Sequence, residues 1–365
     1  MAYSSSTTQI LEMLFKSLIG AASIALSAVG VLGSNNIDER RAFIVFGDSL
    51  SDVGNKQAIF GQPAYWKGRF SNGPVWNEYA AQILSLPLVN YAVGGATSSN
   101  TALVNGTAAN GAFIPSLLDQ IDAFLKNNTK VLRPEDNFVS LNIGGNNILW
   151  PLAVDTNYLF ANEDKIVNGI ADDIATGTKK LLAAGYSRII VHSLPAFQNA
   201  PEIGGPGPAM NIVENLVSKT NDAIKSRVNA ITNSKEHKID FLSVFDATTL
   251  FTTALADSDI LKALGVTDTT AACVHSDSGM YKPDLAVCNN GSDHFYYDLI
   301  HPSTRVHQFL GIFVAHFFVN PRKPADKPEI IRWLTNYRVA QTTPENNLVT
   351  KYKINNVPGF VTPLA

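Results

Sequence analysis

Five short apolar runs, separated by longer amphipathic stretches, constrain the fold more than any other feature of this 365-residue sequence. Each run is rich in Val, Ile and Phe, and together they occupy residues 42–46, 89–93, 138–143, 188–192 and 239–245. Runs that are apolar without clean alternation suit strands buried on both faces of a parallel sheet. Amphipathic helical patterns cover residues 114–126, 166–184, 209–231 and 303–319. This alternation predicts an α/β fold, a three-layer α/β/α sandwich around a mostly parallel five-stranded sheet.

Composition and charge narrow the classes of function. Hydrophobic residues make up 45% of the chain and charged residues 16%, which fits a folded protein with a large core. The formal net charge of −3 leaves no broad basic surface, so we expect no nucleic-acid partner. A Gly-x-Gly-x-x-Gly after a strand, a Walker loop and a His-Glu-x-x-His motif are all missing, which predicts no cofactor and no metal site. Nothing in the sequence indicates an obligate protein partner.

The N-terminus carries a feature of secreted proteins. Residues 18–33 form an uncharged run of small and apolar residues, and Lys16 lies two positions before it. This length fits the apolar segment of a secretory signal peptide better than a membrane-spanning helix, although an uncleaved signal anchor stays open. We therefore expect a leader over residues 1–33, a folded domain over 42–320 and a C-terminal extension over 321–365 with a short helix at 329–340. The expected location is extracellular, with membrane tethering as the alternative.

Secretion changes how the cysteines and asparagines are interpreted. Cys273 and Cys288 are the only two cysteines, and in an oxidising compartment they predict a disulfide. In a cytosolic protein the same two residues would be unpaired thiols. Three Asn-x-Ser/Thr triplets make Asn105, Asn127 and Asn290 candidate glycosylation sites.

Ser49 is the candidate nucleophile. It follows the first predicted strand, within the stretch Phe46-Gly-Asp-Ser-Leu-Ser-Asp-Val-Gly-Asn55. In a parallel sheet, ligands bind outside the carboxyl ends of the strands, which is where this serine falls. The alternative is a serine that caps a helix. The Gly-x-Ser-x-Gly nucleophile elbow is absent because position 51 is serine, so the sequence does not predict an α/β-hydrolase.

A serine nucleophile needs a base, and His301 is the best candidate among the seven histidines. Asp298 lies three residues before it, and Pro302 restricts the backbone at His301. Asp298 can accept from one ring nitrogen and leave the other to take the proton of Ser49. The alternative is an Asp-x-x-His pair that only stabilises a turn.

Two glycine-rich turns offer donors for an oxyanion. Val93-Gly-Gly-Ala-Thr97 follows the second predicted strand, and Ile143-Gly-Gly-Asn-Asn147 follows the third. Glycine lets a backbone N–H approach a ligand closely, and an asparagine side chain can donate as well. One cleft at the strand ends could collect these donors together with the serine and the Asp/His pair.

These residues together resemble the GDSL family of serine esterases, also called SGNH hydrolases. The match consists of four blocks in order, over about residues 42–319: 46–55, 90–97, 143–147 and 298–302. Further segments at 68–79, 86–90 and 193–196 resemble the secreted branch that includes lecithin-dependent haemolysins and glycerophospholipid acyltransferases. Fungal acetylesterases of the family share some of these features.

The resemblance implies a role for each residue. Ser49 would be the nucleophile, His301 the base and Asp298 the group that orients it. The oxyanion donors would be the backbone of Ser49, the backbone of Gly95 and the side chain of Asn146. The third block departs from the family pattern Gly-x-Asn-Asp because Asn147 replaces the aspartate. A carboxylate that could support this loop is therefore missing.

The expected function is hydrolysis of carboxylic esters through an acyl-enzyme. Acyl esters of lipids or phospholipids are the favoured substrates, with transient contact with lipid surfaces. The alternatives are an acetylesterase acting on plant cell-wall carbohydrate and a non-catalytic lipid- or glycan-binding domain on the same scaffold.

Overall fold

The computed structural model describes residues 41–55, 64–100, 113–128, 133–275, 285–321 and 325–352. The predicted leader over residues 1–33 lies outside these ranges. Within them, no helix combines the length and the apolar character needed to cross a membrane.

The central sheet has five strands in the order β2-β1-β3-β4-β5, and every neighbouring pair is parallel. The strands are β1 (Phe43–Gly47), β2 (Leu88–Asn90), β3 (Phe138–Asn142), β4 (Arg188–His192) and β5 (Phe241–Phe245). All residues of β1 are buried, as expected for a strand covered on both faces. The predicted five-stranded parallel sheet is confirmed.

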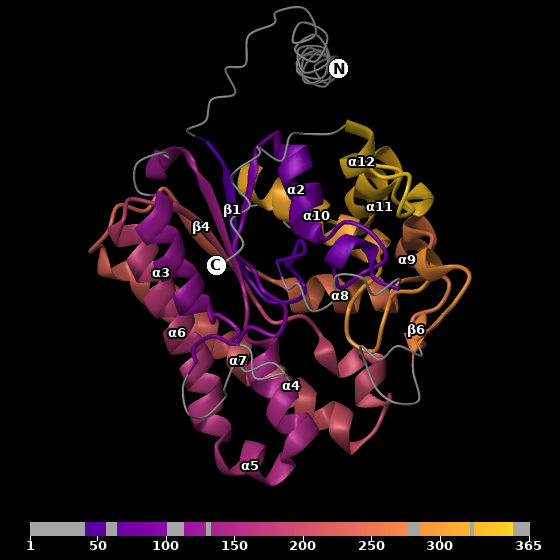
Figure 1. Cartoon of the computed structure of the whole chain (residues 1–365), viewed down its shortest axis with the longest axis horizontal. Helices are drawn as coiled ribbons and strands as arrows, with labels where there is room; N and C mark the ends of the chain where they lie inside the picture. The colour runs from indigo at the N-terminus through magenta and orange to yellow at the C-terminus, as the bar shows by residue number, and fades with distance from the viewer. Residues whose placement is uncertain are drawn as a thin grey trace, which may run out of the picture. The chain divides into compact units, whose positions relative to one another are not determined.

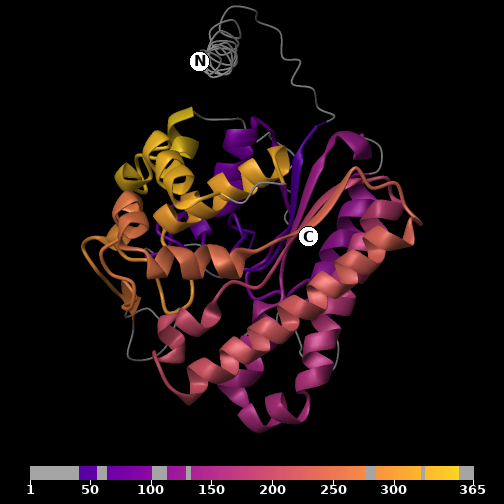
Figure 2. The ribbon, with the colours of Figure 1, turned by 180° about the vertical axis from the view of Figure 1, so that it is seen from behind.

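Helices cover both faces of the sheet, which confirms the three-layer sandwich (Figures 1 and 2). Side chains of β1 alternate between two hydrophobic clusters: Ile44 and Phe46 join the first, Phe43 and Val45 the second. The first face carries α3 (Leu117–Asn128), α4 (Gly145–Val154), α5 (Thr156–Ala161), α6 (Glu163–Ala183) and α7 (Pro208–Ser234). The second carries α2 (Trp76–Leu84), α8 (Ala247–Ala256), α9 (Ser258–Leu264), α10 (Thr304–Val319) and α11 (Lys327–Asn336).

Several helices, among them α8 and α9, lie outside the helical patterns predicted from the sequence. Residues 246–264 contain α8 and α9, each beginning after an aspartate whose carboxylate accepts from the first turn, Asp246 and Asp257. Threonines lower the intrinsic helix propensity of α8. Leu250 and Phe251 are nevertheless buried in the second cluster, so tertiary packing and the two caps stabilise these helices.

The C-terminal extension packs onto the sandwich. Ile330 and Leu334 of α11 are buried in the second cluster, as is Val339. The guanidinium of Arg305 in α10 donates to the carbonyl of Thr342 (3.1 Å). A further short helix, α12 (Leu348–Tyr352), follows. The helix expected at 329–340 is therefore α11, and it contributes to the core.

Candidate active site

Ser49 lies at the carboxyl end of β1, in a tight turn. The preceding Gly47 passes so close to β3 that a Cβ there would come within 2.4 Å of the Asn142 carbonyl oxygen. The backbone N–H of Ser51 donates to the carbonyl of Asp48 (3.0 Å) and closes the turn around Ser49. Ser49 itself is partly exposed, so a substrate can reach its hydroxyl.

The structure brings together the three residues predicted for proton transfer. Nε2 of His301 lies 2.7 Å from Oγ of Ser49, across 252 positions of sequence. Nδ1 of the same ring lies 2.9 Å and 2.8 Å from the two carboxylate oxygens of Asp298. The imidazole therefore stands between a hydroxyl and a carboxylate, the arrangement in which it can take a proton from serine.

Asp298 is buried, with 1% of its surface exposed, and is surrounded by donors. The backbone N–H groups of Ile300 and His301 donate to Oδ1 (2.9 and 2.7 Å), and the Tyr65 hydroxyl donates to Oδ2 (2.9 Å). Burial by itself raises the pKa of Asp298. The charge of His301 and the hydrogen bonds from His301 and Ile300 outweigh it, so this pKa lies below its ordinary value. The carboxylate is thus ionised when it faces the ring.

Besides the backbone of Ser49, the two other predicted oxyanion donors, Gly95 and Asn146, lie on neighbouring turns that are joined to each other. Gly95 follows β2 with a φ of +86°, a backbone conformation that favours glycine. Asn146 lies in the first turn of α4, and its side-chain amide donates to the carbonyl of Ala96 (2.8 Å). An amide group has two N–H donors, so the second can serve an oxyanion. Gly95 and Asn146 are both partly exposed.

Asn147, which stands where the family has aspartate, supports the loop by another route. Its side-chain oxygen Oδ1 accepts from the backbone N–H of Ser98 (3.0 Å), and its side-chain Nδ2 donates to the Ser98 hydroxyl (3.1 Å). That hydroxyl in turn donates to Asp173 (2.7 Å). Asn147 is buried and engaged with Ser98, which separates its role from that of Asn146.

Asp52 is a residue of the first block whose role the sequence did not reveal. Its carboxylate accepts from the backbone N–H of Gly94 (2.7 Å) and from that of Gly54 (2.8 Å). The side chain of Asn55 also donates to the carbonyl of Ala92 (2.9 Å). These bonds join the turn of Ser49 to the turn that carries Gly95. In the sequence, the polar residues that follow Ser49 were the sign that this turn makes contacts with other segments.

An aromatic residue, Phe70, lies beside the ring of His301. Its ring centroid lies 5.0 Å from that of His301. The same ring packs against the glycine turn, since a Cβ added to Gly94 would come within 2.3 Å of it. Phe70 therefore contacts both His301 and the turn that carries Gly95.

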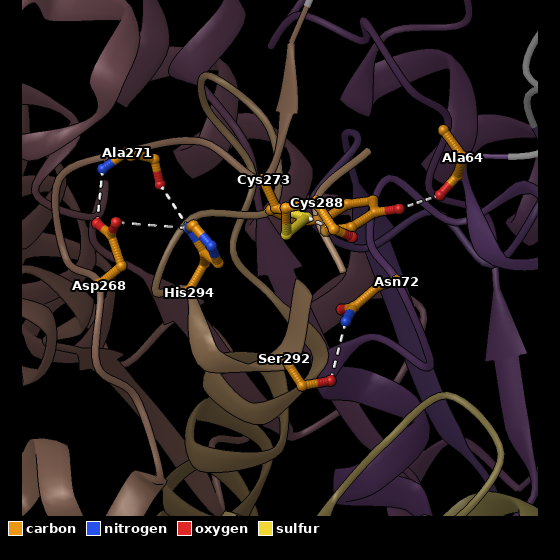
Figure 3. The surroundings of a disulfide bond; sticks show 9 residues. Ala64, Asn72, Asp268, Ala271, Cys273, Cys288, Ser292 and His294 are labelled. Atoms are coloured by element: carbon orange, nitrogen blue, oxygen red, sulfur yellow. Dashed lines mark hydrogen bonds and ion pairs between the residues drawn. A yellow bond between two sulfur atoms is a disulfide. The ribbon is translucent and has the colours of Figure 1, made fainter. Parts of the chain in front are cut away.

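The structure contains the predicted disulfide between Cys273 and Cys288, which confirms that pairing (Figure 3). The first cysteine precedes β6 (Val274–His275), which pairs with β7 (Ala286–Val287). Cys273 and Val274 belong to a third hydrophobic cluster together with Tyr65 and Tyr297. The disulfide thus adjoins the residue before Asp298.

Two of the three candidate glycosylation sites lie on the described surface. Asn127 and Asn290 are exposed. Asn105 lies outside the described residues. Glycosylation at these positions stays a prediction.

Comparison with known families agrees with this geometry. The family model described as GDSL-like Lipase/Acylhydrolase matches residues 43–313. The chain belongs to this family, which confirms the resemblance drawn from the four blocks.

Three relatives illustrate the range of the family. The chain is 26% identical to thermolabile hemolysin of Vibrio parahaemolyticus over 286 residues, 75% of this chain and 62% of the relative. It is 28% identical to phosphatidylcholine-sterol acyltransferase of Aeromonas hydrophila, over 51% of this chain and 52% of the relative. It is 30% identical to acetylajmalan esterase 2 of Rauvolfia serpentina, over 40% of this chain and 51% of the relative. The chain thus spans between half and two thirds of the length of these relatives.

Proposed function

We propose that this protein is a secreted serine ester hydrolase that cleaves carboxylic esters through an acyl-enzyme, with Ser49 as nucleophile, His301 as base and Asp298 as the orienting carboxylate. The observation that carries the proposal is the continuous contact from the Ser49 hydroxyl through both ring nitrogens of His301 to Asp298. An Asp/His pair that only stabilised a turn would not require contact between the histidine ring and a partly exposed serine at the end of a strand.

The reaction has two halves. Oγ of Ser49 attacks the ester carbonyl while Nε2 of His301 takes its proton. The negative charge on the former carbonyl oxygen is stabilised by the backbone N–H groups of Ser49 and Gly95 and by the amide of Asn146. His301 then returns the proton to the leaving alcohol, and the acyl group stays on Ser49. Water attacks the acyl-enzyme with His301 again as base, which releases the acid and restores the serine.

Fatty-acyl esters of lipids or phospholipids are the proposed substrates, with transient contact with lipid surfaces. Support comes from the similarity to proteins named a hemolysin and a phosphatidylcholine-sterol acyltransferase. Small acetyl esters are the second candidate because the chain is also similar to a protein named acetylajmalan esterase. The plant cell-wall acetylesterase activity considered from sequence falls within this second class.

The nucleophile is tested with Ser49→Ala, which removes one partly exposed oxygen at a strand end and should leave the fold intact. We expect esterase activity to disappear while the melting temperature stays that of the wild type. Retained activity would refute the role of Ser49. Lost activity with a large fall in melting temperature would point to a structural role.

The substrate class is tested separately. Hydrolysis of a chain-length series of p-nitrophenyl esters is measured beside hydrolysis of phosphatidylcholine and of acetylated xylan. We expect activity to rise from acetyl to longer chains and phosphatidylcholine to be cleaved. A maximum at acetyl, with release of acetate from xylan, would favour the second candidate.

Secretion is the proposed route, supported by the apolar run of residues 18–33 and by the disulfide. Under this proposal residues 42–320 are the hydrolase domain and 321–365 its C-terminal extension. Mass spectrometry of the protein recovered from medium and from membranes distinguishes cleavage near residue 33 from an intact anchor.

A further inference from the structure

We propose that Tyr65 is a positioning residue for the His301–Asp298 pair: its hydroxyl fixes the carboxylate that orients the base. The proposal rests on the proposed function. Its own basis is the hydrogen bond from the Tyr65 hydroxyl to Oδ2 of Asp298 (2.9 Å), which joins two residues 233 positions apart.

The donors around Asp298 divide between its two oxygens. Oδ1 accepts from the backbone N–H groups of Ile300 and His301, both within the turn that Asp298 itself begins. Oδ2 accepts from the Tyr65 hydroxyl. Among the described contacts of Asp298, this donor comes from a segment outside the turn. A buried ionised carboxylate needs such donors, because water cannot replace them. Nδ1 of His301 faces both oxygens, and Tyr65 holds Oδ2, the one to which the described backbone donors of the turn do not donate.

Tyr65 is itself held in place by its surroundings. It is 4% exposed, and its ring lies 5.9 Å from that of Tyr297 and 6.2 Å from that of Phe70. Both rings belong to the cluster that contains Cys273 of the disulfide. The phenol thus approaches Asp298 from a packed and cross-linked cluster.

Both ends of the segment 64–72 are also attached to the disulfide region, as Figure 3 shows. At one end, the Tyr297 hydroxyl donates to the carbonyl of Ala64. At the other, the amide of Asn72 donates to the Ser292 hydroxyl (3.0 Å). This segment also includes the turn η2 (Trp66–Gly68) and Phe70, which packs on His301. Tyr65 therefore has a fixed position relative to Asp298.

The hydroxyl and the ring of Tyr65 have different roles, which a substitution that removes only the hydroxyl can distinguish. Packing in the cluster requires the ring, whereas orientation of Asp298 requires the hydroxyl. Without the hydroxyl the carboxylate still faces Nδ1, but Oδ2 loses a donor that restrains it, so the imidazole is held less firmly in line with Ser49. Since Tyr65 acts through Asp298, its loss should lower kcat and leave KM unchanged.

The pH profile gives a second signature. The hydroxyl shares the negative charge of Asp298, so its removal leaves more charge facing the ring. A protonated imidazole is then better stabilised in the free enzyme, and the acidic limb of kcat/KM moves to higher pH. The other titratable groups that interact with the pair are the same in the variant: Asp48, Glu202, Tyr297 and His307.

The test compares Tyr65→Phe with Tyr296→Phe in the full chain, with p-nitrophenyl butyrate as substrate. Tyr296 is a matched control: it is 3% exposed, lies two residues before Asp298, and its hydroxyl has no hydrogen-bond partner among the described residues. We expect Tyr65→Phe to lower kcat about tenfold, which is less than the full value of a hydrogen bond to a charged group. The acidic limb of the kcat/KM profile should move to higher pH. Tyr296→Phe should change neither.

Two results would overturn the proposal. If Tyr65→Phe keeps the wild-type kcat and acidic limb, the hydroxyl does not position Asp298. If both variants lose activity in parallel with melting temperature, the effect is one of packing. Ser49→Ala, assayed alongside, separates this proposal from the proposed function, since an active Ser49→Ala refutes the latter whatever Tyr65→Phe does. The downfield proton resonance of His301 Nδ1 gives a readout without activity, and it should shift in Tyr65→Phe alone.

Discussion

Alanine substitution of either asparagine in the turn at 143–147 should separate catalysis from loop support. Asn146 is partly exposed and donates one hydrogen bond, to the carbonyl of Ala96. Its replacement by alanine costs the fold about 1 kcal/mol, the net value of such a bond. If its second N–H binds the oxyanion, kcat falls by ~10²–10³-fold, the effect of losing one donor of this kind.

Asn147 should show the opposite pattern. Its replacement removes both hydrogen bonds to Ser98, a residue that is fully buried. The backbone N–H of Ser98 is then left without this acceptor, at a cost of about 1–3 kcal/mol, and the second bond adds about 1 kcal/mol. We expect a loss of about 2–4 kcal/mol in the free energy of unfolding. The fall in kcat should be much smaller than for Asn146.

The assay measures kcat and KM on a p-nitrophenyl ester and the free energy of unfolding in urea for each variant. Asn146→Asp sharpens the comparison, since it keeps the size of the side chain and removes both N–H donors. Its kcat should fall at least as far as that of Asn146→Ala. A larger loss of kcat in Asn147→Ala than in Asn146→Ala would refute the assignment of the donor.

Two further predictions concern stability. Burial raises the pKa of Asp48 to about 7, so the folded state keeps a proton that the unfolded chain releases near pH 4, and stability falls as pH rises between these values. Asp48→Asn should therefore raise the melting temperature above about pH 7 and have little effect below about pH 4; an equal change at both would contradict the shift. Replacing Cys273 and Cys288 by alanine should lower the free energy of unfolding by ~3 kcal/mol, the loop-entropy value for a 15-residue separation, and lower kcat. Urea unfolding and thiol titration of the unreduced protein check this, since two free thiols would contradict the bridge.

The sheet could be predicted from sequence because each strand is a continuous apolar run. The run at 188–192 coincides with β4. The run at 89–93 does not coincide with β2, which ends at Asn90. Beyond it the backbone N–H groups of Tyr91 and Val93 still donate to carbonyls of β1 (2.9 and 3.1 Å). The Ala92 N–H between them donates to the Asn90 side chain (3.0 Å). The apolar run therefore predicts how far the chain stays in contact with β1, although the regular strand ends at Asn90.

Some residues of the site could likewise be predicted from the sequence, and others could not. Ser49 could be proposed from its place at a strand end, and His301 with Asp298 from their spacing. Tyr65 could not, because the segment that carries it has no periodic pattern and its contact with Asp298 spans 233 positions. Phe70 is similar: an aromatic residue in a turn gives no sign that it packs on a histidine. Residues that support a site from distant segments become visible only when the fold brings those segments together.

The support of the His301–Asp298 pair has a further consequence. The pair lies outside the sheet, just before α10, so its distance from Ser49 depends on contacts made elsewhere. The backbone N–H of Thr304 donates to Asn72 (2.9 Å), which ties the start of α10 to the segment 64–72. The disulfide and Tyr65 belong to a third hydrophobic cluster, separate from the two that cover the sheet. A displacement of about 1 Å at a reacting group can cost about 10²-fold in rate, so loosening this cluster should lower kcat before it unfolds the sandwich.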